Sequence, residues 1–530
     1  MPLIALSLGA QAQVPTDAGV LQQRIERERQ ATLPARVTPQ PAASPGATSP
    51  SSSLSVPVGT FVFKGNTLLS NEQLGSVLSA YSNRNLDYTQ LQEAAAAVAQ
   101  AYRTAGWLAN AFLPPQDIRD GKVTIEVVEA VFGGTKIEGQ AQRVSAAQVL
   151  EIVGAQQSPG QALNIFALDR AQLLADDLPG IAVSGALSAG AVQGQTDLVL
   201  KITDEPVFIA NMLADNHGAL STGTARATAS FYVNNPSNTG DQINATVMAT
   251  EGTRYARLGY GLPVGSDGWR VGANASYLGY KLVNADADGN SHSLGLEARY
   301  PVIRSRLKNL FLELTADRKS FDNRWAGESN TRYTTEALGV SLSGNAFDDA
   351  AGGGVSTATL GWVSGRRDNQ TGTTDSRYNK WHYAVSRQQN IASGLSAFAS
   401  WNGQASSDNL DTSESFYLGG ANGVRAYPSS EGHGSSGDLA KLELRWRTSS
   451  TLSSALFYDH GRVRNRDGSP SYSLKGAGLT LAWQASTDFN LSATLARRIG
   501  SNPNASVTTG SDQDGSLHKN RVWLAASLNF

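Results

Sequence analysis

The last ten residues, Arg521-Val522-Trp523-Leu524-Ala525-Ala526-Ser527-Leu528-Asn529-Phe530, alternate as a strand with one apolar face would. Side chains point to the two faces of a strand in turn, so Val522, Leu524, Ala526, Leu528 and Phe530 share the apolar face. Arg521, Ser527 and Asn529 lie on the other face. Barrels of the bacterial outer membrane need such a strand to close the sheet, with one face against lipid. The segment therefore predicts a transmembrane β-barrel, with Phe530 as its C-terminal signal.

The same alternation continues upstream, through the whole region 205–530. In 270–277, 293–300 and 441–447, every second residue is apolar and the residues between are polar or charged. At roughly 20 residues per strand and turn, the region is long enough for about 16 strands. A soluble two-sheet sandwich is the alternative, but its core would then hold Glu, Arg and Lys side chains at roughly several kcal/mol each. We expect a transmembrane antiparallel β-barrel of about 16 strands.

The composition limits the class of protein. The 530 residues include 53 Gly and no Cys, and their formal net charge is −2. The absence of Cys excludes disulfide scaffolds, Cys-ligated zinc and thiol nucleophiles. The near-neutral charge argues against nucleic-acid binding, which needs a basic stripe. No apolar run approaches the roughly 18 to 20 residues of a membrane helix, so a bilayer could be crossed only by strands.

The N-terminal region combines a possible export signal with a linker. Residues 1–12 are apolar and end in Ala10-Gln11-Ala12, which resembles the remnant of a signal peptide without its basic region. Residues 34–57 consist largely of Pro, Ala, Ser, Thr and Gly, so they are predicted to be a flexible linker.

A single helix is expected between these two segments, within residues 13–33. It would run from Asp17 to Gln30, with Asp17 as its cap and Val20, Leu21 and Ile25 as a thin apolar stripe. A polar helix on a long tether allows two interpretations. One is a disordered tail, and the other is a detachable plug or regulatory element.

Residues 58–131 and 132–204 repeat one plan at a spacing of about 70 residues. The first unit is expected to contain a strand at 61–63, helices at 71–81 and 88–106, and strands at 111–117 and 123–129. The second is expected to contain a strand at 135–139, helices at 145–153 and 167–178, and strands at 181–187 and 196–203. Each unit would be a small α+β domain in which two helices cover a mixed sheet.

Several short motifs follow these units in a definite order. The first unit ends with Gly106-Trp107, Leu113-Pro114-Pro115-Gln116-Asp117, Gly121-Lys122-Val123 and Glu129. The barrel region contains Asp215-Asn216, Gly218, Thr222-Gly223, Arg226, Asn235-Pro236, Gly240-Asp241 and Tyr300-Pro301-Val302-Ile303-Arg304-Ser305-Arg306. Phe416-Tyr417-Leu418-Gly419-Gly420, Val424-Arg425-Ala426-Tyr427-Pro428, Gly437-Asp438 and Phe457-Tyr458-Asp459 follow. In this order and spacing, the chain resembles the two-partner secretion transporters (TpsB) of the haemolysin- and haemagglutinin-activating kind.

The resemblance implies a location, a partner and a set of site residues. The two units would be periplasmic POTRA domains, and the barrel would lie in outer-membrane lipid after insertion by the barrel-assembly machinery. The loop at 419–437 would fold into the lumen with its motif Val424, Arg425, Ala426, Tyr427 and Pro428. Phe457 and Asp459 would form the motif of the inner wall that receives it. The partner would be a secreted TpsA-type exoprotein with an N-terminal secretion domain.

Arg425 is the residue of this loop with the clearest physical role. Its guanidinium offers a planar fork of donors that a carboxylate accepts at two points. Asp459 is expected to point into the lumen, where a pair with Arg425 would fix the loop to the wall. The alternative is an ordinary surface loop with a solvated arginine.

Three further positions bear on this pair. Glu443 is a second inward carboxylate, near enough in sequence to compete for Arg425. Tyr427 and Pro428 would stiffen the turn. Members of the resembling family usually have Gly where this chain has Ala426, and Ala resists positive φ.

Other candidate sites are weaker. Residues 284–289 have the opening spacing of a calcium loop, but Gly295 stands where a Glu is needed, which favours a solvated hairpin loop. The 6 His show no metal-ligand spacing, and Asp348-Asp349 is interpreted as a solvated turn. No nucleophile, base and acid form a set. We therefore expect no catalytic residue, metal, cofactor, nucleotide or nucleic acid.

The expected function is export of one large, unfolded, β-rich partner protein. Two alternatives remain open: an insertase for other barrels, from the same superfamily, and a passive porin. An insertase would use more periplasmic domains, and a porin would need none.

Overall fold

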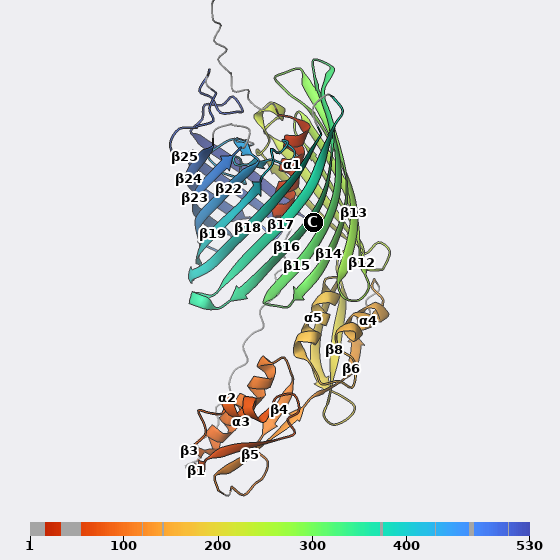
Figure 1. Cartoon of the computed structure of the whole chain (residues 1–530), viewed down its shortest axis with the longest axis vertical. Helices are drawn as coiled ribbons and strands as arrows, with labels where there is room; N and C mark the ends of the chain where they lie inside the picture. Colours follow the sequence, from red (N-terminus) through yellow and green to blue (C-terminus); the bar gives the residue numbers. More distant parts are fainter. Residues whose placement is uncertain are drawn as a thin grey trace, which may run out of the picture.

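The computed structural model describes residues 16–32, 55–118, 120–139, 143–371, 375–429, 431–465, 471–506 and 508–530. Figure 1 shows two small α+β modules at one end of a large barrel and one helix inside the barrel. The possible signal remnant 1–12 and most of the linker 34–57 lie outside the described residues. Within the described part of the chain, no helix combines the length and the apolar character that crossing a membrane requires.

The barrel is a single closed sheet of 16 strands, each antiparallel to its neighbours. The first eight are β9 (Phe208–Asp215), β10 (Arg226–Asn234), β11 (Gln242–Ala249), β12 (Thr253–Val264), β13 (Trp269–Lys281), β14 (Ala287–Arg304), β15 (Lys308–Trp325) and β16 (Glu328–Asp348). The other eight are β17 (Gly354–Asn369), β18 (Ser376–Ala392), β19 (Leu395–Ser406), β22 (Ser436–Arg447), β23 (Leu452–Arg464), β24 (Tyr472–Gln484), β25 (Phe489–Arg498) and β26 (Asn520–Asn529). The prediction of a barrel with about 16 strands is confirmed.

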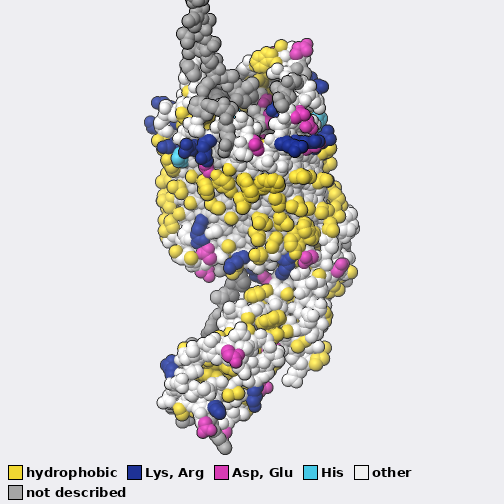
Figure 2. Space-filling view, viewed as in Figure 1, with side chains coloured by type: hydrophobic (Ala, Val, Ile, Leu, Met, Phe, Trp, Pro, Cys, Tyr) yellow, Lys and Arg dark blue, Asp and Glu magenta, His cyan; other side chains and the backbone are white. Residues whose placement is uncertain are grey.

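The outside of the barrel is apolar, as the alternation predicts. Leu294 and Leu296, from the apolar face of one predicted strand, are 64% and 62% exposed. Figure 2 shows such side chains gathered in a band across the face of the barrel in view. A sandwich would bury this face, so the soluble alternative is wrong. Lipid covers such a band in an outer-membrane barrel.

Strands β9 and β26 close the barrel over a short ladder, from Ala525 opposite Asp215 to Asn529 opposite Asn211. Phe530 continues it, because its N–H donates to the Ala210 carbonyl at 2.9 Å. Above the ladder, the Asn216 side chain takes the place of a strand residue. Its Nδ2 donates to the Val522 carbonyl at 2.9 Å, and its Oδ1 accepts from the Leu524 N–H at 2.8 Å.

The first module has two helices on a mixed sheet of order β2-β5-β4. Its elements are β1 (Ser55–Val58), β2 (Thr60–Lys64), α2 (Asn71–Val77), β3 (Arg84–Asp87), α3 (Tyr88–Thr104), β4 (Ala109–Phe112) and β5 (Lys122–Glu129). The largest differences from the expected elements concern β1, α2 and β4. Strand β1 begins in the predicted linker and pairs with β3, which was not expected from the sequence. Helix α2 ends before 81, where the Ser82 hydroxyl donates to the Leu78 carbonyl, and β4 ends before Pro114, which has no N–H for a ladder.

Glu129 fastens the loop after β2 to the rest of the first module. Its carboxylate accepts hydrogen bonds from the Thr67 and Leu68 N–H groups at 2.7 and 2.8 Å and from the Tyr102 hydroxyl at 2.7 Å. Burial raises the pKa of Glu129, but these hydrogen bonds outweigh burial and hold its pKa below the usual value. The carboxylate is therefore ionised at neutral pH. As an acceptor of several hydrogen bonds, it gives the Glu at the end of this unit a structural role.

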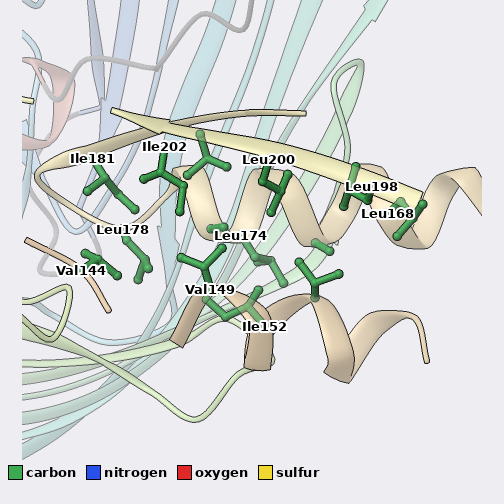
Figure 3. Packing of buried hydrophobic residues seen from close by; sticks show 14 of the residues in the cluster. Val144, Val149, Ile152, Leu168, Leu174, Leu178, Ile181, Leu198, Leu200 and Ile202 are labelled. Carbon is green, nitrogen blue, oxygen red and sulfur yellow. The ribbon is translucent and has the colours of Figure 1, made fainter. Parts of the chain in front are cut away.

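The second module repeats the plan with β6 (Val131–Glu138), α4 (Ala146–Gln156), α5 (Ile165–Asp176), β7 (Ile181–Ala189) and β8 (Gln195–Asp204). Figure 3 shows its core, where apolar side chains of both helices meet those of the sheet. Backbone hydrogen bonds join the two modules: the Leu108 N–H donates to the Leu163 carbonyl at 3.1 Å, and the Leu163 N–H donates to the Ala130 carbonyl at 2.8 Å. Such direct bonds between backbones make the joint stiff.

Two arginines of the motif 300–306 attach the second module to the barrel. Arg304, at the end of β14, binds Asp177 at two points, Nε to Oδ2 at 2.8 Å and Nη2 to Oδ1 at 2.9 Å. Arg306 Nε donates to Asp169 Oδ1 at 2.6 Å. Asp177 caps the end of α5 and Asp169 lies within it. The contacts therefore set the position of this module under the barrel.

We expect Asp177→Arg to loosen this docking by roughly 1–3 kcal/mol, because it replaces a two-point ion pair with repulsion. Distances between a spin label on α5 and one on β14 should then spread over a wider range. The double variant Asp177→Arg with Arg304→Asp should narrow them again, whereas Glu151→Arg on exposed α4 should leave them unchanged. A narrow distribution in the single variant would show that the pair does not hold the module.

Candidate functional site in the barrel lumen

The connection between β19 and β22 folds into the barrel; we call it the lumen loop (residues 407–435). It contains a short antiparallel pair, β20 (Phe416–Tyr417) with β21 (His433–Gly434). Its buried apolar side chains are Phe416, Leu418, Val424, Ala426 and Tyr427. They pack against inward-facing wall residues, which are Leu439, Phe457, Val463, Leu474 and Ala496. The loop is thus packed like a core against one side of the wall.

A glycine in the wall makes room for the tip of the loop. A Cβ at Gly476 of β24 would come within 2.5 Å of the Ala426 Cβ, closer than side chains approach. Ala426 is not among the non-glycine residues with positive φ. The turn therefore accepts alanine without strain.

Arg425 lies beside this point, 8% exposed, and its guanidinium binds two carboxylates of the wall. Nε donates to Asp459 Oδ2 at 2.9 Å and Nη2 donates to Asp459 Oδ1 at 2.7 Å, which is the two-point geometry of an arginine fork. Nη1 lies 2.9 Å from Glu443 Oε1. The guanidinium carbon also lies 3.5 Å from the centre of the Phe457 ring. Arg425 is not a solvated surface side chain.

Glu443 does not compete with Asp459, contrary to expectation. The two carboxylates bind different nitrogens of one guanidinium, and Glu443 also pairs with Arg445 Nη2 at 2.8 Å. Asp459 is fully buried and accepts the Arg425 backbone N–H at 3.0 Å as well. Arg425 is thus bound to two neighbouring strands of the wall, to β22 through Glu443 and to β23 through Asp459.

Tyr427 and Pro428 continue the tip towards the end of the chain. The Tyr427 ring is fully buried, and the guanidinium carbon of Arg498 lies 4.4 Å from its centre. The carbonyl of Pro428 accepts the Glu431 N–H at 3.1 Å, which closes a turn. Val424 donates its N–H to the Leu418 carbonyl at 2.7 Å. The five motif residues therefore form one packed turn.

Helix α1 (Ala18–Thr32) lies in the lumen, with its apolar stripe against the wall opposite the lumen loop. Leu21 and Ile25 are buried among inward-facing residues, which are Met248, Tyr255, Leu278, Tyr280, Phe321 and Tyr333. Asp17 caps the helix, since its Oδ1 accepts the Val20 N–H at 2.8 Å. Two of the three residues of the expected stripe, Leu21 and Ile25, thus pack against the wall, and Val20 is buried outside this cluster.

Charged side chains connect α1 to the wall and to the lumen loop. Lys319 Nζ of β15 lies 2.9 Å from Glu26 Oε2 on the helix and 3.8 Å from Glu414 Oε1 on the loop. Glu414 also binds Lys380 Nζ of β18 at 2.6 Å. Arg27 Nη1 donates to the Tyr417 carbonyl of the loop at 2.6 Å. The helix and the loop therefore share contacts in the lumen.

Three residues of this arrangement were not identified from the sequence as site residues. Arg226, quoted only as part of a hairpin motif, binds Asp215 on β9 and Glu28 on α1. Lys319 has no local pattern that marks it. The Trp523 indole Nε1 donates to the Arg425 carbonyl at 2.7 Å. The alternation of residues 521–530 places Trp523 on the inward face with Arg521. This pattern could have identified Trp523 as a lumen residue.

A closed barrel with an apolar outer band, a packed lumen loop and two α+β modules at one end defines an outer-membrane transporter of the POTRA-barrel class. The haemolysin secretion/activation protein family (ShlB/FhaC/HecB) matches residues 194–483, and the ShlB-type POTRA domain matches residues 56–130. The chain belongs to this family. It is an outer-membrane protein whose POTRA domains lie in the periplasm, and the predictions of family and location are confirmed.

Relatives and solved structures agree with this assignment. The heme/hemopexin transporter protein HuxB of Haemophilus influenzae (strain Rd) is 24% identical over 88% of this chain and 86% of that protein. The outer membrane transporter CdiB of Dickeya dadantii is 22% identical over 79% of each. The structure of CdiB from Escherichia coli has a TM-score of 0.72 at 20% identity and covers 99% of this chain and 100% of that one. HuxB and the Dickeya dadantii CdiB are named as transporters.

Proposed function

We propose that the chain exports one large, unfolded, β-rich protein, a TpsA-type exoprotein with an N-terminal secretion domain, and activates it by doing so. One observation carries the proposal: the lumen is filled by α1 and the lumen loop, and both are attached to the wall by side chains. Elements attached in this way can leave without breaking the barrel ladder. A transporter of a whole polypeptide needs such removable obstacles.

The two modules would act as POTRA domains that catch the partner. Each of their three-stranded sheets has two edge strands, β2 and β4 in the first and β6 and β7 in the second. An extended segment of the partner can add to such an edge through backbone hydrogen bonds, which do not depend on side-chain identity. The stiff joint between the modules would present these edges in a fixed relation.

The partner would then pass through the lumen as a hairpin. Helix α1 would leave as a plug, and the loop around Arg425 would shift. Polar lumen residues, namely Glu297, Arg299, Glu443 and Arg445, would keep an unfolded chain from adhering to the wall. The periplasm has no ATP, so the free energy would come from binding and from folding of the partner outside the cell. The protein would thus work without catalysis, cofactor, metal, nucleotide or nucleic acid.

The barrel would reach outer-membrane lipid through the barrel-assembly machinery. The two alternatives would use the same fold differently. An insertase would fold other barrels, and a passive porin would conduct without a partner. Two modules together with a filled lumen favour export.

Reconstitution with the partner separates the three. Liposomes containing the protein should deliver a purified, unfolded partner that carries its secretion domain to the opposite side, where added protease reaches it. A partner without that domain should stay behind. Folding of an unrelated barrel precursor, or steady conductance with no transport, would instead identify an insertase or a porin.

A further inference from the structure

The outer face of the barrel changes from apolar to cationic at one level on β23, β24 and β25. The apolar side chains below that level are Leu456, Tyr458, Leu479 and Leu495. The side chains immediately above are His460, Arg462, Lys475 and Arg497, which we call the outer basic patch. Arg462, Lys475 and Arg497 are exposed. Figure 2 shows Lys and Arg side chains just above the hydrophobic band, at the end of the barrel away from the modules.

The register brings the members of the patch together. His460 lies directly opposite Lys475, and Arg497 lies opposite Ala477, the next outward position along β24. Side chains at such positions are neighbours on one face of a sheet. Arg462 lies opposite Ser473, the outward position of β24 next to Lys475. Like charges so close repel one another, so the patch carries a cost that a bound anion would remove.

Carboxylates neutralise other outward cations of this barrel but not these. Arg366 Nη2 lies 2.8 Å from Glu336, which Arg318 also approaches, and Arg332 Nη2 lies 2.8 Å from Asp322. In the described part of the chain, no carboxylate forms an ion pair with Arg462, Lys475 or Arg497. Asp438 lies opposite Arg462, but it pairs with Arg464 at 3.2 Å. An anion from outside the protein can therefore neutralise the patch.

We propose that the outer basic patch binds the phosphate groups of the glycolipid of the outer leaflet, lipopolysaccharide. The patch lies where the apolar band ends, which is the depth of lipid headgroups. It lies at the end away from the periplasmic modules, so it faces the leaflet that contains this glycolipid. Arginine and lysine are the side chains that bind phosphate, arginine at two points. Asn520 of β26 lies opposite Arg497, so the bound lipid would stand next to the closing strand.

Binding of fluorescent bisphosphorylated lipid A to the full-length protein in detergent tests the proposal. The triple variant Arg462→Gln, Lys475→Gln, Arg497→Gln should bind about a hundredfold more weakly, because each basic residue near a lipid surface contributes roughly fivefold. The matched control is Arg318→Gln, Arg332→Gln, Arg366→Gln, which removes three outward cations that already have carboxylate partners. Its affinity should stay within about twofold of the original, and both variants should unfold at the same temperature as the parent.

Competition experiments identify the headgroup. Unlabelled bisphosphorylated lipid A should displace the probe, whereas its dephosphorylated form and phosphatidylglycerol should displace it at least about tenfold less well. Equal competition by either of these lipids would overturn the assignment. So would unchanged affinity in the triple variant, or an equal loss in the control.

Discussion

Arg425→Ala is expected to reduce secretion of the partner at least about tenfold while the barrel stays folded in the outer membrane. The substitution removes the fork to Asp459 and the contact to Glu443; the buried Asp459 loses its cation, whereas Glu443 keeps its pair with Arg445. Breaking a buried ion pair from one side costs roughly 3–5 kcal/mol. The cost falls on the seated lumen loop, because the strand ladders do not depend on Arg425. Partner protein in the culture medium and heat-modifiable migration of the barrel are the two measurements.

Two further variants show whether geometry or charge matters. Arg425→Lys keeps the charge but has no planar fork, so we expect secretion closer to Arg425→Ala than to the parent. Arg445→Ala is the matched control: Arg445 also pairs with Glu443, but its other hydrogen bond goes to Gln388 of the wall. It should lose far less secretion than Arg425→Ala, because it leaves the fork to Asp459 in place and removes one of several polar side chains of the lumen. Full secretion by a membrane-inserted Arg425→Ala barrel would remove the fork from the mechanism.

Deletion of residues 17–30 is expected to raise the ion conductance of the reconstituted protein several-fold. A helix with its side chains is roughly 10–12 Å across. Helix α1 lies in the lumen, so the deletion removes an obstacle of about this width. Barrels of this strand number enclose an aqueous channel when no element fills them. Single-channel recording in planar bilayers measures the change. The lumen loop stays seated through Arg425, so the open channel should remain narrower than an empty barrel.

A replacement of residues 17–30 by a Gly/Ser segment of equal length controls for the shortened tether. It should conduct like the deletion, because it has neither the apolar stripe nor Glu26 and Glu28. Lys319→Gln removes one contact of Glu26 and should increase brief openings without permanent opening. Conductance equal to that of the parent in both the deletion and the replacement would show that α1 does not obstruct the channel.

The barrel and its modules were predictable because alternation and helical periodicity are local signals. The predicted ends of elements were wrong where a residue interrupts the backbone hydrogen bonds. Pro114 has no N–H for the strand ladder, and the Ser82 hydroxyl binds the Leu78 carbonyl. The pairing of Arg425 with Asp459 came from resemblance to a family together with the geometry of the fork. The wall residues that bind α1 could not be predicted from local patterns, since Lys319 and Arg226 each contribute one side chain from distant strands. No sequence pattern links such residues before the barrel closes around them.

The hydrogen bond from Trp523 to the Arg425 carbonyl has a consequence for biogenesis. Arg425 meets its carboxylates on β22 and β23, but the indole belongs to β26, the strand that closes the barrel against β9. Ser429, further along the tip, donates to the His217 carbonyl beyond β9 at 2.9 Å. The full set of contacts that holds the lumen loop thus forms only after β9 and β26 have paired. A half-assembled barrel lacks the hydrogen bonds from Trp523 and to His217, so its lumen loop is not yet fully held. Full obstruction of the channel therefore coincides with closure of the barrel.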